Sequence, residues 1–446
     1  MIFTNEQLEI IQAINNKQNV FITGPGGTGK STIIKYLANE WTTLGGGTQR
    51  VCTIGITAMT GAAAVLINGQ TLHSYLGIGL GKDSVDDLVI KIMNRSKIKK
   101  NWDDLDILVV DEISMLSDDL LIKLNKVAKK IRANENPFGG IQLVFAGDFL
   151  QLPCIKGNFC FECDDWIECA FTTFHLTKIL RQHDIRFQEC LNNARYGRIT
   201  LEDIEYCTVN HRSQTDGPAP KALVGKSQGP DVPFGKGAAC IKPTRIFCHN
   251  ADVNEINERK LKKLNATEIK QYDSDIEYNS NFYDPRKHKF IFQDITKICN
   301  AQPTISLAVG AQVMLLINID TKNGLVNGSR GVVLEFTNNE LPVVLFKNGS
   351  KLVIDFHKYE VTEGKKLIGT IFQIPLKLAY AITVHKSQGM TLDSAIIDLN
   401  GVFEYGQAYV ALSRVKDVNS LYLYNALKSS FKAHPKAVNF YEKILD

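Results

Sequence analysis

A glycine-rich segment near the N-terminus constrains this chain more than any other feature. The segment from Gly24 to Ser31 reads GPGGTGKS and fits the pattern G-x-x-x-x-G-K-[ST] of a phosphate-binding loop. The apolar run Val20 to Thr23 before it predicts a buried strand, and the apolar spacing from Ser31 to Trp41 predicts a helix. Strand, loop and helix together predict a site for a nucleoside triphosphate.

Each part of this loop has a chemical task. Its glycines let backbone N–H groups close around phosphate oxygens, and the helix N-terminus adds positive potential. We expect Lys30 to hold the β- and γ-phosphates of ATP and Ser31 to ligate Mg²⁺. The nucleotide-binding residues predicted from the loop are Gly24, Gly26, Gly27, Thr28, Gly29, Lys30 and Ser31.

Length and composition set broad limits. With 446 residues the chain can form two or three domains, and a net charge of +4 is compatible with a nucleic-acid partner without indicating one. The absence of a long apolar run or a signal peptide predicts a soluble, intracellular protein with no membrane partner. Ten scattered cysteines favour a reducing compartment over a disulfide framework.

One group of cysteines has two interpretations, a zinc site or buried thiols. Cys154, Cys160, Cys163 and Cys169 precede His175, but only Cys160-x-x-Cys163 has a metal-like spacing. Because aromatic residues alternate with these thiols, we expect them to be buried in a core.

A second chemical landmark lies about 80 residues after the loop. The strand predicted from Asp106 to Val110 ends in Asp111 and Glu112. Paired acids can simply begin a helix, but after a phosphate-binding loop we expect Asp111 to hold Mg²⁺ and Glu112 to act as the general base. Beyond the end of the strand predicted for 141–146, the amide of Gln151 could sense the γ-phosphate or position water.

Several other residues have two interpretations. Gln7 could read the adenine edge, or it could only close a capping box with Thr4; the local sequence does not separate the two. Thr57 lies at the end of a predicted strand, where open α/β sheets bind ligands. His73 is as compatible with a structural histidine as with a nucleic-acid contact.

The chain predicts two α/β domains. The segment 215–244 contains five of the thirteen prolines and predicts a linker between a first domain, 1–214, and a second, 245–446. Short strands with a period of two predict a small β-barrel inserted near 322–375. Arginines that reach the nucleotide from a facing domain would make closure of the cleft depend on the triphosphate.

The motifs together resemble the petite-integration-frequency (PIF) family of DNA helicases, within helicase superfamily one. The resemblance spans nearly the whole chain. Its most specific segments are 111–115, 136–142, 147–153, 310–314, 324–328, 385–391 and 406–414. The departures are Cys154, where the family usually has proline, and the lack of a long N-terminal extension, which suggests a chain close to a bare motor core.

The resemblance implies an α/β fold with two RecA-like P-loop NTPase domains, a small wedge insertion near 70–105 and an SH3-like barrel. It implies that Gln7 reads adenine. The catalytic residues that it implies are Lys30, Glu112, Gln151, Arg181 and Arg414. The DNA-binding residues that it implies are Thr57, His73, His385, Lys386 and Ser387.

The activity implied by the resemblance is an ATP- and Mg²⁺-dependent helicase that moves 5′→3′ on single-stranded DNA. Forked and G-quadruplex DNA would be substrates, with roles in replication, repair, recombination or telomere maintenance. The oligomeric state stays open, a monomer included. The alternatives are a single-strand-stimulated NTPase or remodelling factor on DNA or RNA without processive unwinding and, more remotely, a nucleotide kinase or GTPase.

Overall fold

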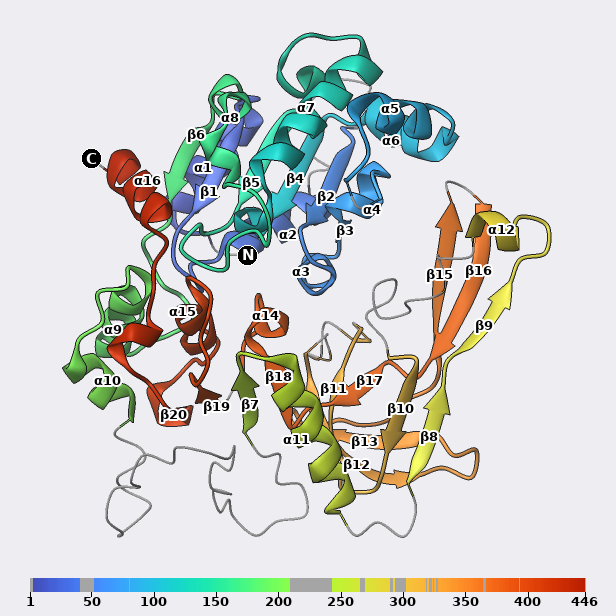
Figure 1. Cartoon of the computed structure of the whole chain (residues 1–446), viewed down its shortest axis with the longest axis vertical. Coiled ribbons are helices and arrows are strands. Elements are labelled where there is room, and N and C mark those ends of the chain that lie inside the picture. Colours follow the sequence, from blue (N-terminus) through green and yellow to red (C-terminus); the bar gives the residue numbers. More distant parts are fainter. Residues whose placement is uncertain are drawn as a thin grey trace.

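The computed structural model describes residues 3–40, 52–79, 81–208, 243–264, 269–288, 292, 302–317, 319–320, 323, 325, 328–363, 366–392 and 394–445. These residues form two α/β lobes and an antiparallel β insertion (Figure 1). The predicted linker, 215–244, lies outside the described residues except for its last two positions.

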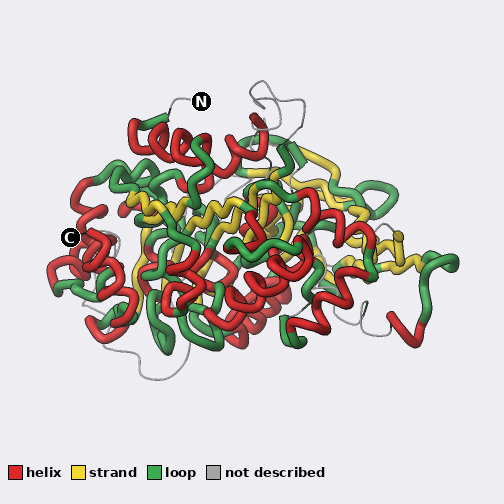
Figure 2. The backbone as a smooth tube through the Cα atoms, turned by 90° about the horizontal axis from the view of Figure 1, so that it is seen from above, coloured by secondary structure: helices red, strands yellow, loops and turns green. Residues whose placement is uncertain are grey.

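The first lobe is built on a six-stranded sheet in the order β3-β2-β4-β5-β1-β6, with every pair parallel. Its strands are β1 (Val20–Thr23), β2 (Ile54–Ala58), β3 (Gln70–Thr71), β4 (Ile107–Asp111), β5 (Gln142–Ala146) and β6 (Thr172–His175). Seen from above, strands form a layer between helices (Figure 2). Buried parallel strands are apolar on both faces, which explains why β1 and β4 read as continuous apolar runs.

Two helix layers cover this sheet. Residues Val20 and Ile22 share one core with α1 (Asn5–Asn15), α2 (Lys30–Glu40) and α3 (Gly61–Leu66). Phe21, between them, belongs to the core on the other face. That face is covered by α4 (Leu72–Leu76), α5 (Val85–Met93), α6 (Ser96–Asp104), α7 (Asp118–Arg132) and α8 (Asp164–Glu168). Helices α5 and α6 fall in the range predicted for the wedge.

The second lobe contains a four-stranded parallel sheet in the order β18-β7-β19-β20. Its strands are β7 (Thr244–Phe247), β18 (Ala381–Thr383), β19 (Ala395–Asp398) and β20 (Leu421–Tyr424). Its helices include α11 (Asn250–Lys262), α14 (Val384–Ser387) and α15 (Gln407–Leu412). The expected fold class, two RecA-like α/β domains with small inserted sheets, is confirmed.

The two lobes exchange helices (Figure 1). Helices α9 (Ile185–Arg195) and α10 (Leu201–Thr208) contribute Phe187 and Cys207 to the core of the second lobe. Helix α16 (Pro435–Leu445) contributes Tyr441 to the core of the first. The predicted ranges 1–214 and 245–446 therefore do not follow the two cores, because the linker prediction used only local composition. Segment 215–244 joins α10 to β7, and both elements pack in the second lobe.

The insertion consists of antiparallel sheets ordered β14-β13-β12-β11-β17, β15-β16-β9 and β10-β8. Its strands are β8 (Lys270–Asp273), β9 (Asp275–Tyr278), β10 (Thr304–Leu307), β11 (Gln312–Leu315), β12 (Arg330–Phe336), β13 (Pro342–Phe346), β14 (Lys351–Val353), β15 (His357–Glu363), β16 (Lys366–Gln373) and β17 (Leu376–Leu378); α12 (Pro285–His288) follows β9. The antiparallel strands thus begin well before the predicted range 322–375.

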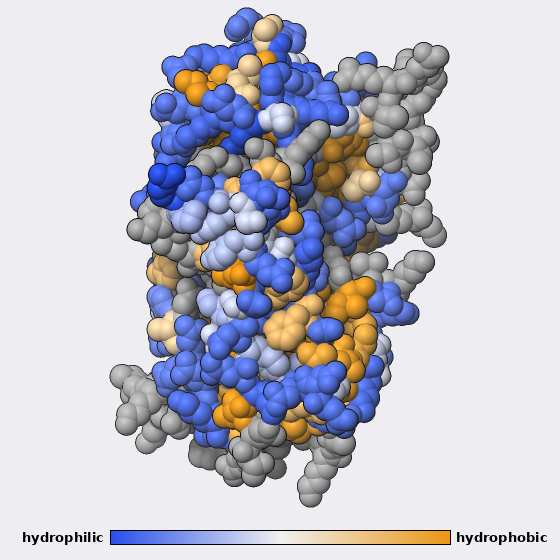
Figure 3. All heavy atoms as spheres, turned by 90° about the vertical axis from the view of Figure 1, so that its right-hand side faces the viewer, coloured by the Kyte–Doolittle hydropathy of each residue, from blue (hydrophilic) through white to orange (hydrophobic). Residues whose placement is uncertain are grey.

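The surface of the insertion is partly apolar. In the side view, apolar side chains gather over the lower half of the molecule, on the side of the insertion (Figure 3). Within the insertion, Tyr278, Phe282, Val353 and Phe356 are exposed large hydrophobic residues. Among the described helices, none combines the length and apolar character needed to cross a bilayer.

Candidate nucleotide and nucleic-acid sites

A cavity of about 760 Å³ lies where the two lobes and the insertion meet. The first lobe lines it with the phosphate-binding loop, the end of β4 and Gln151. The second lobe contributes residues 389–391 and Arg414, and the insertion contributes residues 328–330 and 346–348. Ten predicted site residues line this cavity: Gly26, Gly27, Gly29, Lys30, Ser31, Asp111, Glu112, Gln151, Arg181 and Arg414.

The loop requires glycine at positions that the sequence pattern identified. Gly24 and Gly29 have φ of +135° and +90°, a region that side chains disfavour. A Cβ on Gly24 would lie 2.3 Å from the carbonyl oxygen of Leu176, and one on Gly29 would lie 2.7 Å from Nε2 of Gln7. Glycine is therefore required at both positions for two reasons: the backbone conformation of the loop, and the close contact of the loop with neighbouring elements.

Lys30 folds back over the loop. Its Nζ donates to the carbonyl oxygens of Gly24 at 2.6 Å and Pro25 at 2.9 Å. Burial lowers the pKa of Lys30 to about 8, although nearby carboxylates oppose the shift. Thr28 Oγ1 donates to the same Pro25 carbonyl at 3.0 Å. Phosphate oxygens would offer this ammonium stronger, charged acceptors than the loop carbonyls do.

The acidic pair lies directly beside the loop. Ser31 Oγ donates to Asp111 Oδ2 at 3.2 Å. Burial, helped by the adjacent Glu112, raises the pKa of Asp111 to about 7. One hydroxyl and one carboxylate fit Mg²⁺, which keeps most of its waters and takes the remaining ligands from phosphates. Bound there, the ion would supply positive charge opposite the phosphates.

Glu112 is held from the opposite lobe. Gln388, directly after α14, donates from Nε2 to Glu112 Oε2 at 2.9 Å. Glu112 itself has φ 56° and ψ 46°, a left-handed conformation that directs the chain away from the strand. Gln388 lies in a segment that carries the family resemblance, but the sequence reasoning gave it no role. Only the contact across the cleft reveals it.

The two arginines meet at one point of the second lobe. Arg181 Nη1 donates to the carbonyl oxygen of Ser413 at 2.9 Å, and Arg414 Nη2 donates to Ser413 Oγ at 2.7 Å. A Cβ on Gly26 would lie 3.5 Å from Arg414 Nη2, so this guanidinium sits against the phosphate-binding loop. Both arginines line the cavity that contains the phosphate-binding loop.

Gln7 closes the capping box and has one side-chain donor left over. Its Oε1 accepts from the backbone N–H of Thr4 at 3.1 Å, and its own N–H donates to Thr4 Oγ1 at 3.3 Å, which completes a capping box. Its Nε2 is buried against Gly29 and has no hydrogen-bond acceptor among the described residues. The unused donor keeps adenine recognition as a proposal.

The five residues predicted to contact DNA differ in how exposed their side chains are. The hydroxyls of Thr57 and Ser387 are buried and donate to the carbonyl oxygens of Val109 at 2.6 Å and Val384 at 2.7 Å. Their side chains are therefore turned away from any DNA in this conformation. His73 on α4 is half-buried, and Lys386 is exposed. His385 Nε2 lies 2.7 Å from Glu404 Oε2.

A buried ion pair was missed from the sequence. Arg195 of α9 forms two bonds of 2.9 Å to the carboxylate of Asp148, which follows β5, and both side chains are fully buried. Burial alone would raise the pKa of Asp148, but Arg195 brings it below its usual value. Tyr409 of α15 accepts from the N–H of Gly26 at 2.8 Å. The sequence around Arg195 contains no motif that indicates its pairing with Asp148.

The expectation of buried thiols holds for two of the four cysteines: Cys160 and Cys169 lie in the core of the first lobe, whereas Cys154 and Cys163 are half-buried. Cys160 and Cys169 are buried, and Cys163 Sγ donates to the Cys160 carbonyl at 3.3 Å. Within the described ranges, no three His, Cys, Asp or Glu side chains are grouped as metal ligands.

Comparison with known proteins gives consistent matches. The family model of the PIF1-like helicases matches residues 2–203, and that of the 2B domain of DNA helicase Pif1 matches residues 295–336. The chain is 34% identical to uncharacterized protein 030L of Invertebrate iridescent virus 6, covering 98% of this chain and 94% of that protein. It is 36% identical to the Xenopus laevis ATP-dependent DNA helicase PIF1, over 99% of this chain and 64% of that protein.

A solved structure matches over the full length. The Pif1 helicase from Candida albicans is 32% identical with a TM-score of 0.79, and each chain is covered completely. The present chain spans slightly less than two thirds of the vertebrate helicases that it matches.

Proposed function

The chain belongs to the PIF1-like helicase family, and from this membership we propose that it is an ATP-dependent DNA helicase that moves 5′→3′ on single-stranded DNA. One observation supports this most strongly. The phosphate-binding loop and acidic pair of one lobe share a cavity with Arg414 of the other. Hydrolysis at such a junction can change the spacing of the two lobes.

The proposed chemistry assigns each residue a task. Lys30 and the loop N–H groups bind the phosphates, while Ser31 and Asp111 hold Mg²⁺. Glu112 accepts a proton from the attacking water, and Gln151 positions that water near the γ-phosphate. Arg181 and Arg414 stabilise the charge that develops on the transferred phosphoryl group.

Movement follows from the placement of these groups on two lobes. Arg414 and Gln388 belong to the second lobe, whereas Lys30 and Glu112 belong to the first. Bound triphosphate would draw the lobes together through the arginines, and loss of the γ-phosphate would release them. A strand held by both lobes would then advance once per cycle.

The finer parts of the proposal rest on the family. Forked and G-quadruplex DNA are the expected substrates, and replication, repair, recombination or telomere maintenance the expected setting. An intracellular location is supported by the eight cysteines of the described residues, all of which are free. The DNA contacts proposed are His73, His385 and Lys386, with Thr57 and Ser387 contributing only through their backbone or after a local rearrangement.

Unwinding assays on matched forks test the proposal. We expect a duplex with a 5′ single-stranded tail to open faster than the same duplex with a 3′ tail, and Lys30→Ala to open neither. Faster opening of the 3′-tailed duplex would refute the polarity. ATP hydrolysis that is stimulated by single strands without any unwinding would instead indicate a remodelling factor.

A further inference from the structure

Helix α15 of the second lobe is held against the first lobe at two points. At its N-terminal end, Gly406 packs so closely that a Cβ there would lie 2.4 Å from the carbonyl oxygen of Gln151. Further along the helix, the hydroxyl of Tyr409 accepts a hydrogen bond of 2.8 Å from the N–H of Gly26 in the phosphate-binding loop. The helix lies on the side of the second lobe that faces the first (Figure 1). One short helix therefore contacts both the loop and the segment expected to sense the γ-phosphate.

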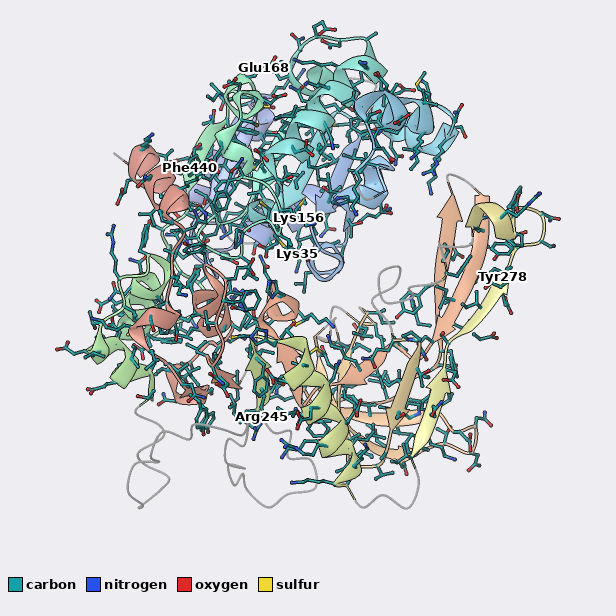
Figure 4. All side chains as sticks on the ribbon, in the orientation of Figure 1. Lys35, Lys156, Glu168, Arg245, Tyr278 and Phe440 are labelled. Atoms are coloured by element: carbon teal, nitrogen blue, oxygen red, sulfur yellow. The ribbon has the colours of Figure 1, made fainter. Side chains whose placement is uncertain are left out.

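The guanidinium of Arg414 is attached to the same helix. Its Nε donates to the carbonyl oxygen of Val410 at 2.8 Å, and Val410 directly follows Tyr409 in α15. Arg414 and Gly26 both line the nucleotide cavity. Figure 4 shows Lys35, which lines this cavity too, on the side of the first lobe that faces the second. Because the guanidinium is bonded to α15, the position of this helix sets where Arg414 lies in the cavity.

The side chain of Tyr409 is set back from the cavity. It is only 2% exposed, belongs to the core of the second lobe and is not one of the described residues that line the cavity. Tyr409 can therefore influence the reaction only through the groups that it holds. Burial, helped by the charge of Asp148, raises the pKa of Tyr409 to about 12, so the phenol keeps its proton near neutral pH. The hydrogen bond to Gly26 is thus a bond between two neutral groups.

We propose that Tyr409 is a positioning residue for ATP hydrolysis, an inference that rests on the proposed helicase function. By holding the N–H of Gly26, its hydroxyl fixes α15 against the phosphate-binding loop, and with α15 it fixes the guanidinium of Arg414. Small displacements of a catalytic group are costly, since a misplacement of about 1 Å can lower a rate by about 10²-fold. Arg414 is expected to act on charge that develops during the reaction, so loss of the Tyr409 hydroxyl should raise the energy of the transition state more than that of the bound nucleotide.

The variant Tyr409→Phe tests this role because it removes the hydroxyl and keeps the ring. We expect kcat for ATP hydrolysis with single-stranded DNA to fall by about 2- to 12-fold, the factor that corresponds to losing one neutral hydrogen bond. The KM for ATP should change by less than about twofold, the pattern of an interaction that matters only in the transition state. Steady-state phosphate release at a series of ATP concentrations measures both constants.

Binding of a transition-state analogue gives a readout that a merely structural role would not move. ADP with fluoroaluminate mimics the phosphoryl group in transfer, and the affinity for such an analogue reports how well the site fits the transition state. With a fluorescent ADP, Tyr409→Phe should weaken binding in the presence of fluoroaluminate by the same factor as it lowers kcat. Binding of the fluorescent ADP alone should stay unchanged, which also shows that the variant is folded.

Tyr380→Phe is the matched control. The hydroxyl of Tyr380, a second buried tyrosine, also accepts from a backbone N–H, that of Gln312 at 3.1 Å, but Tyr380 does not line the cavity. We expect this control to keep the wild-type kcat. An unchanged kcat for Tyr409→Phe, or equal losses of ADP binding with and without fluoroaluminate, would overturn the positioning role while leaving the helicase function intact. A wild-type protein that does not hydrolyse ATP in the presence of single-stranded DNA would refute the proposed function itself.

Discussion

Gln388 of the second lobe donates a 2.9 Å hydrogen bond to the carboxylate of Glu112 in the first. The side chain expected to activate water is therefore positioned by the lobe that has to move against it. Its orientation depends on how the cleft is closed. This contact gives a direct structural route from lobe position to hydrolysis.

Removing this contact should slow hydrolysis without preventing nucleotide binding. For Gln388→Ala we expect kcat with single-stranded DNA to fall about tenfold or more, because a hydrogen bond to a charged group is lost. Steady-state phosphate release in the presence of single-stranded DNA measures this kcat. Asn419→Ala, at an exposed position of the same lobe, is the control. An unchanged kcat would show that Glu112 is oriented by other groups.

Arg414 should act in the transition state more than in binding. Arg414→Ala is expected to lower kcat by about 10³- to 10⁵-fold, the range for an arginine that meets the transferred phosphoryl group. Arg414→Lys should restore little, since lysine lacks the planar fork of donors. Lys126→Ala on the exposed side of α7 is the control. Retention of a tenth of the activity would contradict the assigned role.

Nucleotide binding should take up a proton at alkaline pH. In the free protein burial lowers the pKa of Lys30 to about 8, so the amine is increasingly neutral above that pH. Phosphate oxygens favour the charged form and raise the pKa again. Affinity should then fall as the pH rises above 8, by up to tenfold for each unit. Calorimetry in buffers of different ionisation enthalpy at pH 8.5–9.5 measures the uptake, and Lys30→Met should abolish it.

The C-terminal helix should contribute to the stability of the first lobe. Tyr441 of α16 shares a hydrogen bond of 2.5 Å with Thr23 Oγ1, at the end of β1, and accepts from the N–H of Phe149 at 3.1 Å. Tyr441→Phe leaves the Thr23 hydroxyl and the Phe149 N–H without this hydrogen-bond partner. It should therefore lower the free energy of unfolding by about 1–3 kcal/mol. Urea denaturation measures it. Tyr405→Phe, at a partly exposed tyrosine, should have no such effect.

Much of the nucleotide site could be predicted from the sequence because its parts are local. The spacing of glycines, Lys30 and Ser31 is set by one turn between a strand and a helix. Asp111 and Glu112 follow an apolar strand, and parallel strands end at the same edge of a sheet. The chemical groups of the site therefore lie in short segments that can be recognised one at a time in the sequence.

Contacts between distant segments were not predictable in this way. An amphipathic helix shows which of its faces is buried but not which core buries it, so the sequence did not show that α9 and α10 pack in the second lobe and α16 in the first. The Thr57 hydroxyl likewise bonds to Val109, on a strand 52 residues further along the chain, whereas the Ser387 hydroxyl bonds within its own helical turn to Val384.

The sequence by itself determined the family, the nucleotide chemistry and the α/β class, since each depends on residue type and local spacing. Only the tertiary structure decided which helices serve which lobe, that Asp148 pairs with Arg195, and that Gln388 holds Glu112. The physical reason is that these contacts join residues far apart in the chain, and the local sequence around each residue does not indicate its partner. Their partners become defined only when the whole chain has folded.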